Sequence, residues 1–155
     1  MTTPIIEHIA ANLVTTVNGV TITNGCNQNL SAMRSRRLDF PADEAPVDGI
    51  VMIVQGEPSA PVILNAAVIE WIQPFALNAF VIDDDDATAS IDTRINKVRS
   101  DLEKALLVDH TRGGYAVDTL LEPPTFFPES ETATGITINI TIRYRTIYAD
   151  PYTGA

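Results

Sequence analysis

Cysteine is nearly absent from this chain. Cys26 is the single cysteine among 155 residues, so no intramolecular disulfide is possible, and no residue set has the spacing of a zinc site. We expect Cys26 to be a buried, unpaired thiol. Aromatic residues make up only 6% of the chain, so aliphatic side chains must supply most of the core. This length fits a single domain, residues 1–155, that needs neither metal nor disulfide to be stable.

Long hydrophobic runs are also missing. No apolar run approaches the roughly 20 residues that a membrane-spanning helix needs, and the first residues lack the pattern of a signal peptide. We therefore expect a soluble protein made in a reducing cytoplasm, with no membrane partner.

Basic residues are missing from the middle of the chain. The net charge is −10, and the segment between Leu38 and Thr93 contains eleven acidic residues but no Lys or Arg. This segment should present negative potential, whereas phosphate binding needs clustered cations. The pattern argues against nucleic acid as a direct ligand. It favours a partner with a basic patch, or a surface that DNA slides past, although the acids could simply keep the protein soluble.

The N-terminal segment predicts a short helix followed by a hairpin. Apolar residues recur at helical spacing over residues 4–14, with Thr3 as the expected cap and Pro4 as the first helical residue. Asn18-Gly19 then lies between two β-branched runs. Because both central residues of a type I′ turn need positive φ, this dipeptide predicts a β-hairpin.

Residues 88–108 have the strongest helical pattern of the chain. Apolar residues fall at steps of three and four, which predicts a helix with one buried stripe. Thr88 or Ser90 is the expected N-cap, and the aspartates before it favour the positive end of the helix. The solvent face should contain two i,i+4 ion pairs: Lys97–Asp101 and Arg99–Glu103.

Strand patterns occupy much of the rest. Strict alternation of apolar and polar residues over 136–148 predicts a strand much longer than the usual five or six residues. Within the apolar stretch 62–82, Pro74 predicts an edge position or a bulge. The other expected strands are 30–40, 49–56 and 115–121.

This order of elements predicts an α+β domain. A mostly antiparallel sheet should carry the two main helices on one face. Loops are expected at 41–46, 57–61 and 122–135.

No residue set in the sequence satisfies the requirements of a catalytic or metal site. Asp83–Asp86 point in different directions as consecutive residues and cannot wrap one ion, so we expect a solvated loop. Neither His8 nor the Asp109-His110 pair has a nucleophile that the sequence links to it. Gly113-Gly114 follows a helix and lacks the lysine of a phosphate loop, which predicts a C-cap. We expect no catalytic residue, cofactor or metal.

Arginines cluster just before the acidic middle of the chain. If copies of the protein met basic to acidic, this cluster would contact the acids of residues 41–48 on a neighbour. The alternative is an ordinary charged strand. The residues concerned are Arg34, Arg36 and Arg37 on one side and Asp43, Glu44 and Asp48 on the other.

The second half of the chain resembles a known family. A helix reading "INKVRSDLEKALLVD" is followed by "HTRGGYAVDTLLEP", a loop, and an alternating strand that ends "IRYRTIYADPY". This arrangement, over about residues 62–152, resembles the tail terminator (tail-completion, minor tail protein) family of long-tailed bacteriophages. The Gly-Gly turn before "AVDT" and the closing aromatic-Arg-Thr…Asp-Pro-Tyr are its most specific parts.

The resemblance implies a structural virion protein. Members of this family assemble as a hexameric ring that caps the finished tail tube, stops further addition of tube subunits and offers the surface to which the head docks. It implies as partners further copies of the chain, the tail-tube protein and a head–tail connector, with DNA passing through the ring without specific binding. It also implies assembly in the host cytoplasm and a final place at the head-proximal end of the tail.

The resemblance also suggests why the last strand is so long. Its edge, or the face containing Arg143 and Arg145, would be available to a neighbouring subunit. Loops 41–48, 57–61 and 122–134 become candidates for contact with the tube or neck.

Two other functions remain open at this point. A tail-tube subunit or a neck connector would share a related design, and a tube subunit would stack into filaments. A small enzyme or ligand-binding domain would need a concave pocket with convergent polar groups.

Overall fold

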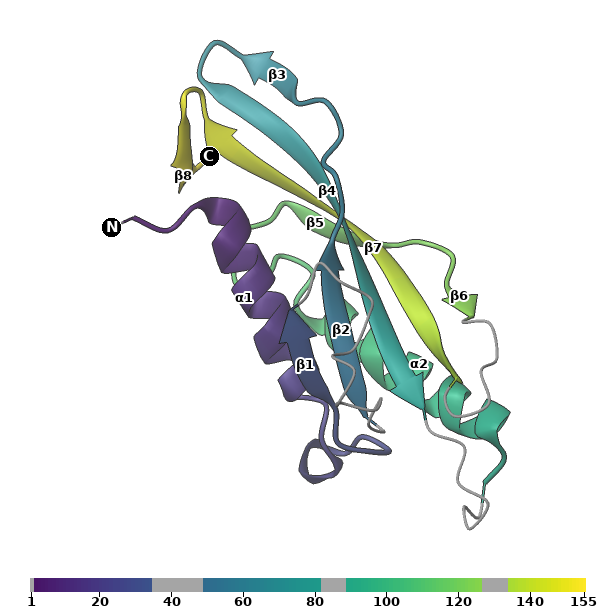
Figure 1. Cartoon of the computed structure of the whole chain (residues 1–155). Coiled ribbons are helices and arrows are strands. Elements are labelled where there is room, and N and C mark those ends of the chain that lie inside the picture. The colour runs from purple at the N-terminus through teal and green to yellow at the C-terminus, as the bar shows by residue number, and fades with distance from the viewer. Residues whose placement is uncertain (1, 35–48, 82–88, 127–133) are drawn as a thin grey trace, which may run out of the picture.

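The computed structural model describes residues 2–34, 49–81, 89–126 and 134–155, in which each main helix is followed by a run of strands (Figure 1). The described elements form one α+β domain, as predicted. In chain order they are α1 (Ile5–Asn18), the short 3-10 helix η1 (Ile22–Asn24), β1 (Ser31–Arg34), β2 (Ile50–Gln55), β3 (Val62–Asn65), β4 (Val68–Val81), α2 (Ile91–Val108), β5 (Asp118–Leu121), β6 (Thr125–Phe126), β7 (Thr134–Ile147) and β8 (Asp150–Gly154).

Strands β4 and β7 form the centre of the sheet. They pair antiparallel from Val68↔Ile147 to Val81↔Thr134, the full 14 residues of each strand. The order is β1-β2-β4-β7-β5, with β3 added to β4 and with β6 and β8 added to β7. Among the described strands, β1 and β2 alone are parallel. The prediction of a mostly antiparallel sheet is confirmed.

One face of this sheet and both helices enclose the core. Ala79 lies opposite Ile136 and Phe75 opposite Ile140, so the odd residues of β4 and the even residues of β7 point the same way. The buried stripes of α1 and α2 belong to the same apolar cluster as that face. Neither described helix is long and apolar enough to cross a membrane. The core includes Ile9, Leu13, Leu77, Val98, Leu102, Leu106, Ile136, Ile138, Ile140 and Ile142.

Helix α1 is longer than predicted, and the hairpin prediction is wrong. The helix runs through Asn18, and Gly19 closes it with φ −77°, so neither residue forms a type I′ turn. Val17 lies on the buried face, and its burial favours one more helical turn over a hairpin. The cap also differs, because Pro4 occupies the N-cap position and no side chain, Thr3 included, caps the helix.

Helix α2 matches its predicted span closely. Ser90 is the N-cap, and its hydroxyl accepts a hydrogen bond from the Thr93 backbone N–H at 3.4 Å. The predicted Arg99–Glu103 ion pair is present at 2.7 Å. The predicted Lys97–Asp101 pair is wrong, since Asp101 is buried and accepts hydrogen bonds from the backbone and side chain of Asn27.

Pro74 lies inside β4 without a bulge. The β4–β7 register continues unbroken through Pro74↔Thr141. Its missing N–H falls on the side where β2 has already ended at Gln55, and there its carbonyl accepts from the Gly56 N–H at 3.0 Å. Of the two predicted possibilities, the bulge is wrong and the edge position describes the local situation.

Three other predicted segments are confirmed in part. The strand expected at 49–56 is β2, whereas the described part of 30–40 forms only the short β1. The stretch 62–82 divides into β3 and β4 at a turn.

Gly113-Gly114 form a turn with positive φ, but the helix C-cap is Asp109, so the predicted cap is wrong.

Strand β7 confirms the predicted long alternating strand. Its even residues from Ile136 to Thr146 are buried. The expectation that its edge is free for a neighbour is wrong, because β4 lies along one side of β7 and β8, β5 and β6 lie along the other.

Substitutions along β7 should distinguish its core positions from its distal end. Ile138→Ala creates a cavity under the helices and should lower the free energy of unfolding by about 2–5 kcal/mol. Ile147→Ala removes the same atoms from an exposed position and should cost less than about 1 kcal/mol, the span of strand propensity. Urea denaturation of both variants checks this; equal losses would contradict the proposed core.

Candidate interaction surfaces

The far end of the sheet projects beyond the helices. We call this part the distal arm: β3, residues 68–71 of β4, residues 144–147 of β7, and β8 (Figure 1). Strand β8 contacts α1, and polar and aromatic contacts between strands supply further packing in this part. The rings of Trp71 and Tyr144 stack with centroids 6.4 Å apart, and the Trp71 indole N–H donates to the Thr146 hydroxyl at 3.0 Å. Cross-strand pairs of this kind stabilise a sheet.

Asn65 positions the edge strand of the arm. Its side-chain oxygen accepts a hydrogen bond from the Ala67 backbone N–H at 2.8 Å, and this contact forms the turn between β3 and β4. The Ala67 carbonyl accepts from the Tyr148 N–H at 2.8 Å, which joins this turn to the end of β7. Asparagine favours such turns because its side chain can replace a backbone hydrogen bond.

Strand β3 exposes an apolar surface. Val62, Ile63 and Leu64 are 48%, 62% and 44% exposed, and residues 58–69 contain no charged residue. Within the described part of the chain β3 pairs with β4 alone, so its other edge is open. Proteins usually protect such edges with charges or a covering element. The sequence predicts a strand over this stretch, but its apolar composition gives no sign that these side chains are exposed.

The two arginines of β7 differ in their partners. Arg145 Nε lies 2.9 Å from Glu70 Oε2 across the sheet, so its charge is matched within the chain. Arg143 is half-buried and lies opposite Asp118 in the β5–β7 register. Its buried Nε has no hydrogen-bond partner among the described residues.

Of the predicted basic cluster, the structure describes one residue, Arg34. Arg34 forms an ion pair with Glu7 of α1, and the structure does not bring it together with Arg143 or Arg145. The remaining candidates lie outside the described residues: Arg36, Arg37, Asp43, Glu44 and Asp48.

A groove of about 370 Å³ lies between the C-terminal parts of α1 and α2. Val20, Cys26, Ala105 and Val108 supply its apolar lining, and Lys104 lies on its border. Cys26 is a free thiol, as predicted, but it is half-buried rather than buried because it lines this groove. Val108 is 79% exposed, although it belongs to an apolar segment.

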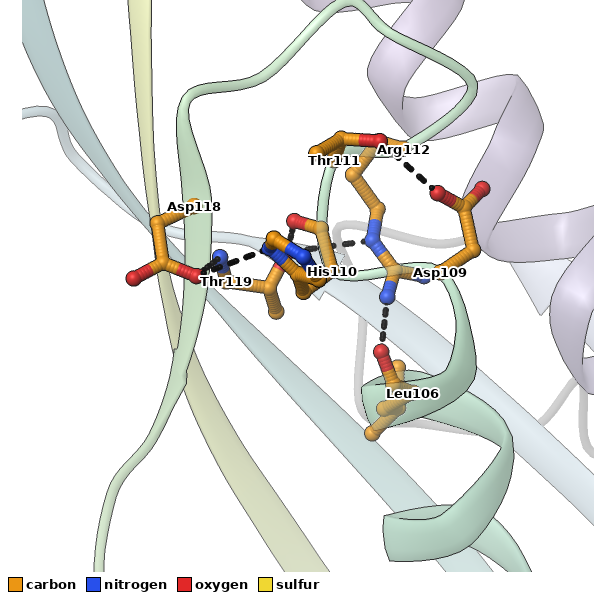
Figure 2. Close-up of polar contacts among 7 residues, drawn as sticks. All are labelled: Leu106, Asp109, His110, Thr111, Arg112, Asp118 and Thr119. Carbon is orange, nitrogen blue, oxygen red and sulfur yellow. Dashed lines mark hydrogen bonds and ion pairs between the residues drawn. The ribbon is translucent and has the colours of Figure 1, made fainter.

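A buried arginine ties together the ends of the helices. Arg112 is 0% exposed, and Figure 2 shows its guanidinium reaching the Leu106 carbonyl in the last turn of α2. Its Nε donates to the Thr119 hydroxyl of β5 at 3.0 Å, and Nη1 lies 3.4 Å from Asn12 Oδ1 of α1. Three elements thus meet at one side chain. Sequence reasoning missed this residue, because an arginine beside Gly-Gly resembles any loop cation.

Asp109 completes this network and has a shifted pKa. Burial alone would raise the pKa of its carboxyl. Hydrogen bonds from the Gly113 N–H, the Asn12 amide and the Thr111 hydroxyl, together with the charge of Arg112, lower that pKa below its usual value. Burial lowers the pKa of Arg112, and Asp109 opposes that shift.

The histidines do not form a catalytic arrangement with the described residues around them. His110 Nδ1 lies 3.3 Å from Asp118 Oδ1 (Figure 2), but the nearby Thr119 hydroxyl donates to the His110 carbonyl and not to its ring. His8 stacks on Tyr115 with ring centroids 4.5 Å apart. The described residues contain no group of three or more His, Cys, Asp or Glu that could hold a metal ion. Asp83–Asp86 lie outside the described residues.

No protein-family model matches the chain, and no curated protein matches it.

Replacing the buried Arg112 should destabilise the fold more than replacing the half-exposed Arg145, which forms an ion pair at the surface. Arg112→Met leaves the buried Leu106 carbonyl without its donor, which should lower the free energy of unfolding by about 1–3 kcal/mol. Arg145→Met is the matched control and should cost at most about 1 kcal/mol, because Arg145 is half-exposed. Thermal and urea denaturation measure both; an Arg112→Met variant as stable as wild type would refute this role.

Asp109 should make the protein sensitive to acid. Because its pKa is lower in the folded chain than in the unfolded chain, it stabilises the fold above the unfolded value of about 3.9. That stability is lost as the pH falls through the folded value. Between about pH 5 and about pH 2, Asp109→Asn should therefore lose less unfolding free energy than wild type. The control Glu122→Gln, at an exposed carboxylate, should lose as much as wild type in the same urea titrations.

Proposed function

We propose that this protein is a structural virion component, a tail terminator that assembles as a ring on the end of a phage tail tube. The observation that carries the proposal is the distal arm with its uncharged, exposed edge strand β3. The resemblance of residues 62–152 to the tail terminator family supports the same function. In this role the ring ends polymerisation of the tube and provides the surface to which the head docks.

An open apolar edge is a feature of subunits rather than of isolated domains. Contact with another chain covers the unpaired backbone groups of such an edge and removes its side chains from water. Each Å² of apolar surface buried in this way contributes roughly 25 cal/mol. A contact between two different surfaces closes into a ring when the rotation between subunits allows closure. The arm therefore supports assembly of several copies.

The acidic composition suits a ring through which DNA passes. With a net charge of −10, the chain as a whole repels phosphates, which favours passage over binding. The proposed partners are further copies of the chain in a hexameric ring, the tail-tube protein below and a head–tail connector above. The proposed location is the head-proximal end of the tail, reached after assembly in the host cytoplasm. Neither catalysis nor a cofactor is part of this function.

Solution mass measured with and without the tail-tube protein tests the proposal. We expect a discrete ring, six times the chain mass, either alone or once tube protein is present. In negative-stain images, tubes grown with the protein present should be shorter and end in one added ring.

Two results would contradict this function. Filaments of the protein by itself would instead indicate a tail-tube subunit. A monomer at every concentration that leaves tube length unchanged would exclude an assembly role altogether.

A further inference from the structure

A ring made by one kind of interface needs two different complementary surfaces on each subunit. Strand β3 supplies one of them. Resting on the proposed function, we infer that the second is the groove between α1 and α2, and that β3 of one copy docks into this groove on the next copy. The occupant of the groove is thus a second copy of the same chain.

The groove has the size and chemistry that β3 requires. Its volume of about 370 Å³ lies in the roughly 300–1,000 Å³ range of pockets that hold small ligands, and it can accept a few aliphatic side chains. Val20, Ala105 and Val108 give it an apolar lining. Apolar side chains such as Ile63 gain most from a site that is already apolar and half-enclosed.

Charge favours self-association at these two places. Copies with a net charge of −10 repel one another wherever their acidic surfaces meet. Residues 58–69 carry no charge, so β3 can approach a neighbour without that repulsion. On the groove side, the lining includes the cation of Lys104 together with the carboxylates of Asp101 and Asp109, so charges of both signs are present there.

The geometry of the fold requires that the two surfaces come from different copies. β3 lies at the far end of the distal arm, whereas the segment that follows α1 lies at the opposite end of the molecule (Figure 1). A free sheet edge at β1 is a poorer receptor, because the Ala32 N–H already donates to the Asn18 side chain at 2.8 Å and α1 lies beside this strand.

The single native cysteine provides a direct test. Cys26 lines the groove, so Ile63→Cys places a second thiol on the docking strand. A disulfide forms only when the Cβ atoms approach to about 3.5–4.5 Å. Each Ile63→Cys copy has two thiols, one on β3 and one in the groove. Under mild oxidation with diamide, we therefore expect a ladder of cross-linked species, up to the full ring, on a non-reducing gel. Reduction should collapse the ladder to one band.

Two variants make this result specific. Adding Cys26→Ser to Ile63→Cys should abolish the ladder. Leu120→Cys, at a position on β5 that is 49% exposed, is the matched control and should give no ladder with Cys26. Dimers that persist in the Ile63→Cys/Cys26→Ser variant would instead show a β3–β3 contact and overturn the inference.

Solution mass of the same samples separates this inference from the proposed function. A ring that forms without the Cys26-dependent ladder would overturn the docking contact and leave the proposed function intact. The absence of any assembly, with or without tube protein, would overturn both. Val108→Asp adds a charge at an exposed groove position and should prevent ring formation while leaving the melting temperature of the monomer within a few degrees of wild type.

Discussion

The pairing of β4 with β7 is the constraint on which the other elements depend. Every described strand except β1 attaches directly to one of these two, and both helices cover their shared face. A slip of one residue in this ladder would exchange the buried and exposed faces. The continuous row of buried isoleucines on β7, opposite Phe75, Leu77 and Ala79, excludes such a slip. The same ladder continues past the helices, so it also fixes where β3 is presented.

Arg112 plays the corresponding role at the ends of the helices. A buried guanidinium is stable only where its donors find acceptors, and here they come from the last turn of α2, from α1 and from β5. Because the polar partners come from three elements, they determine how α1 and α2 meet. The groove lies between the C-terminal parts of those helices, with Asp109 on its border. Its shape therefore depends on a polar network that joins both helices to strand β5.

Local pattern predicted some elements well and failed where distant residues decide. The alternation of β7 and the apolar stripe of α2 depend on neighbours in sequence, and both are predicted correctly. Ser90, the observed cap of α2, is one of the two caps that the sequence offers. Asn18-Gly19 ends a helix instead of turning a hairpin, because burial of Val17 outweighs turn preference. Asp101 turns inward to Asn27, 74 residues away. The candidate surfaces were harder to predict, because nothing in the apolar sequence of residues 62–64 distinguishes an exposed strand from a buried one.

Two properties of the chain have opposite effects on the association of copies. The length of the distal arm exposes apolar side chains, which favours association, while the acidic charge of the whole chain keeps copies apart at long range. Repulsion between charges extends about a Debye length, near 8–10 Å at physiological salt, whereas apolar burial acts only on contact. Association should therefore be slow at low salt and become faster as salt screens the acids. Once formed, the contact should depend on its two apolar surfaces, β3 and the groove, and little on salt. Such a balance favours assembly at a site where copies are already held close together over assembly free in solution.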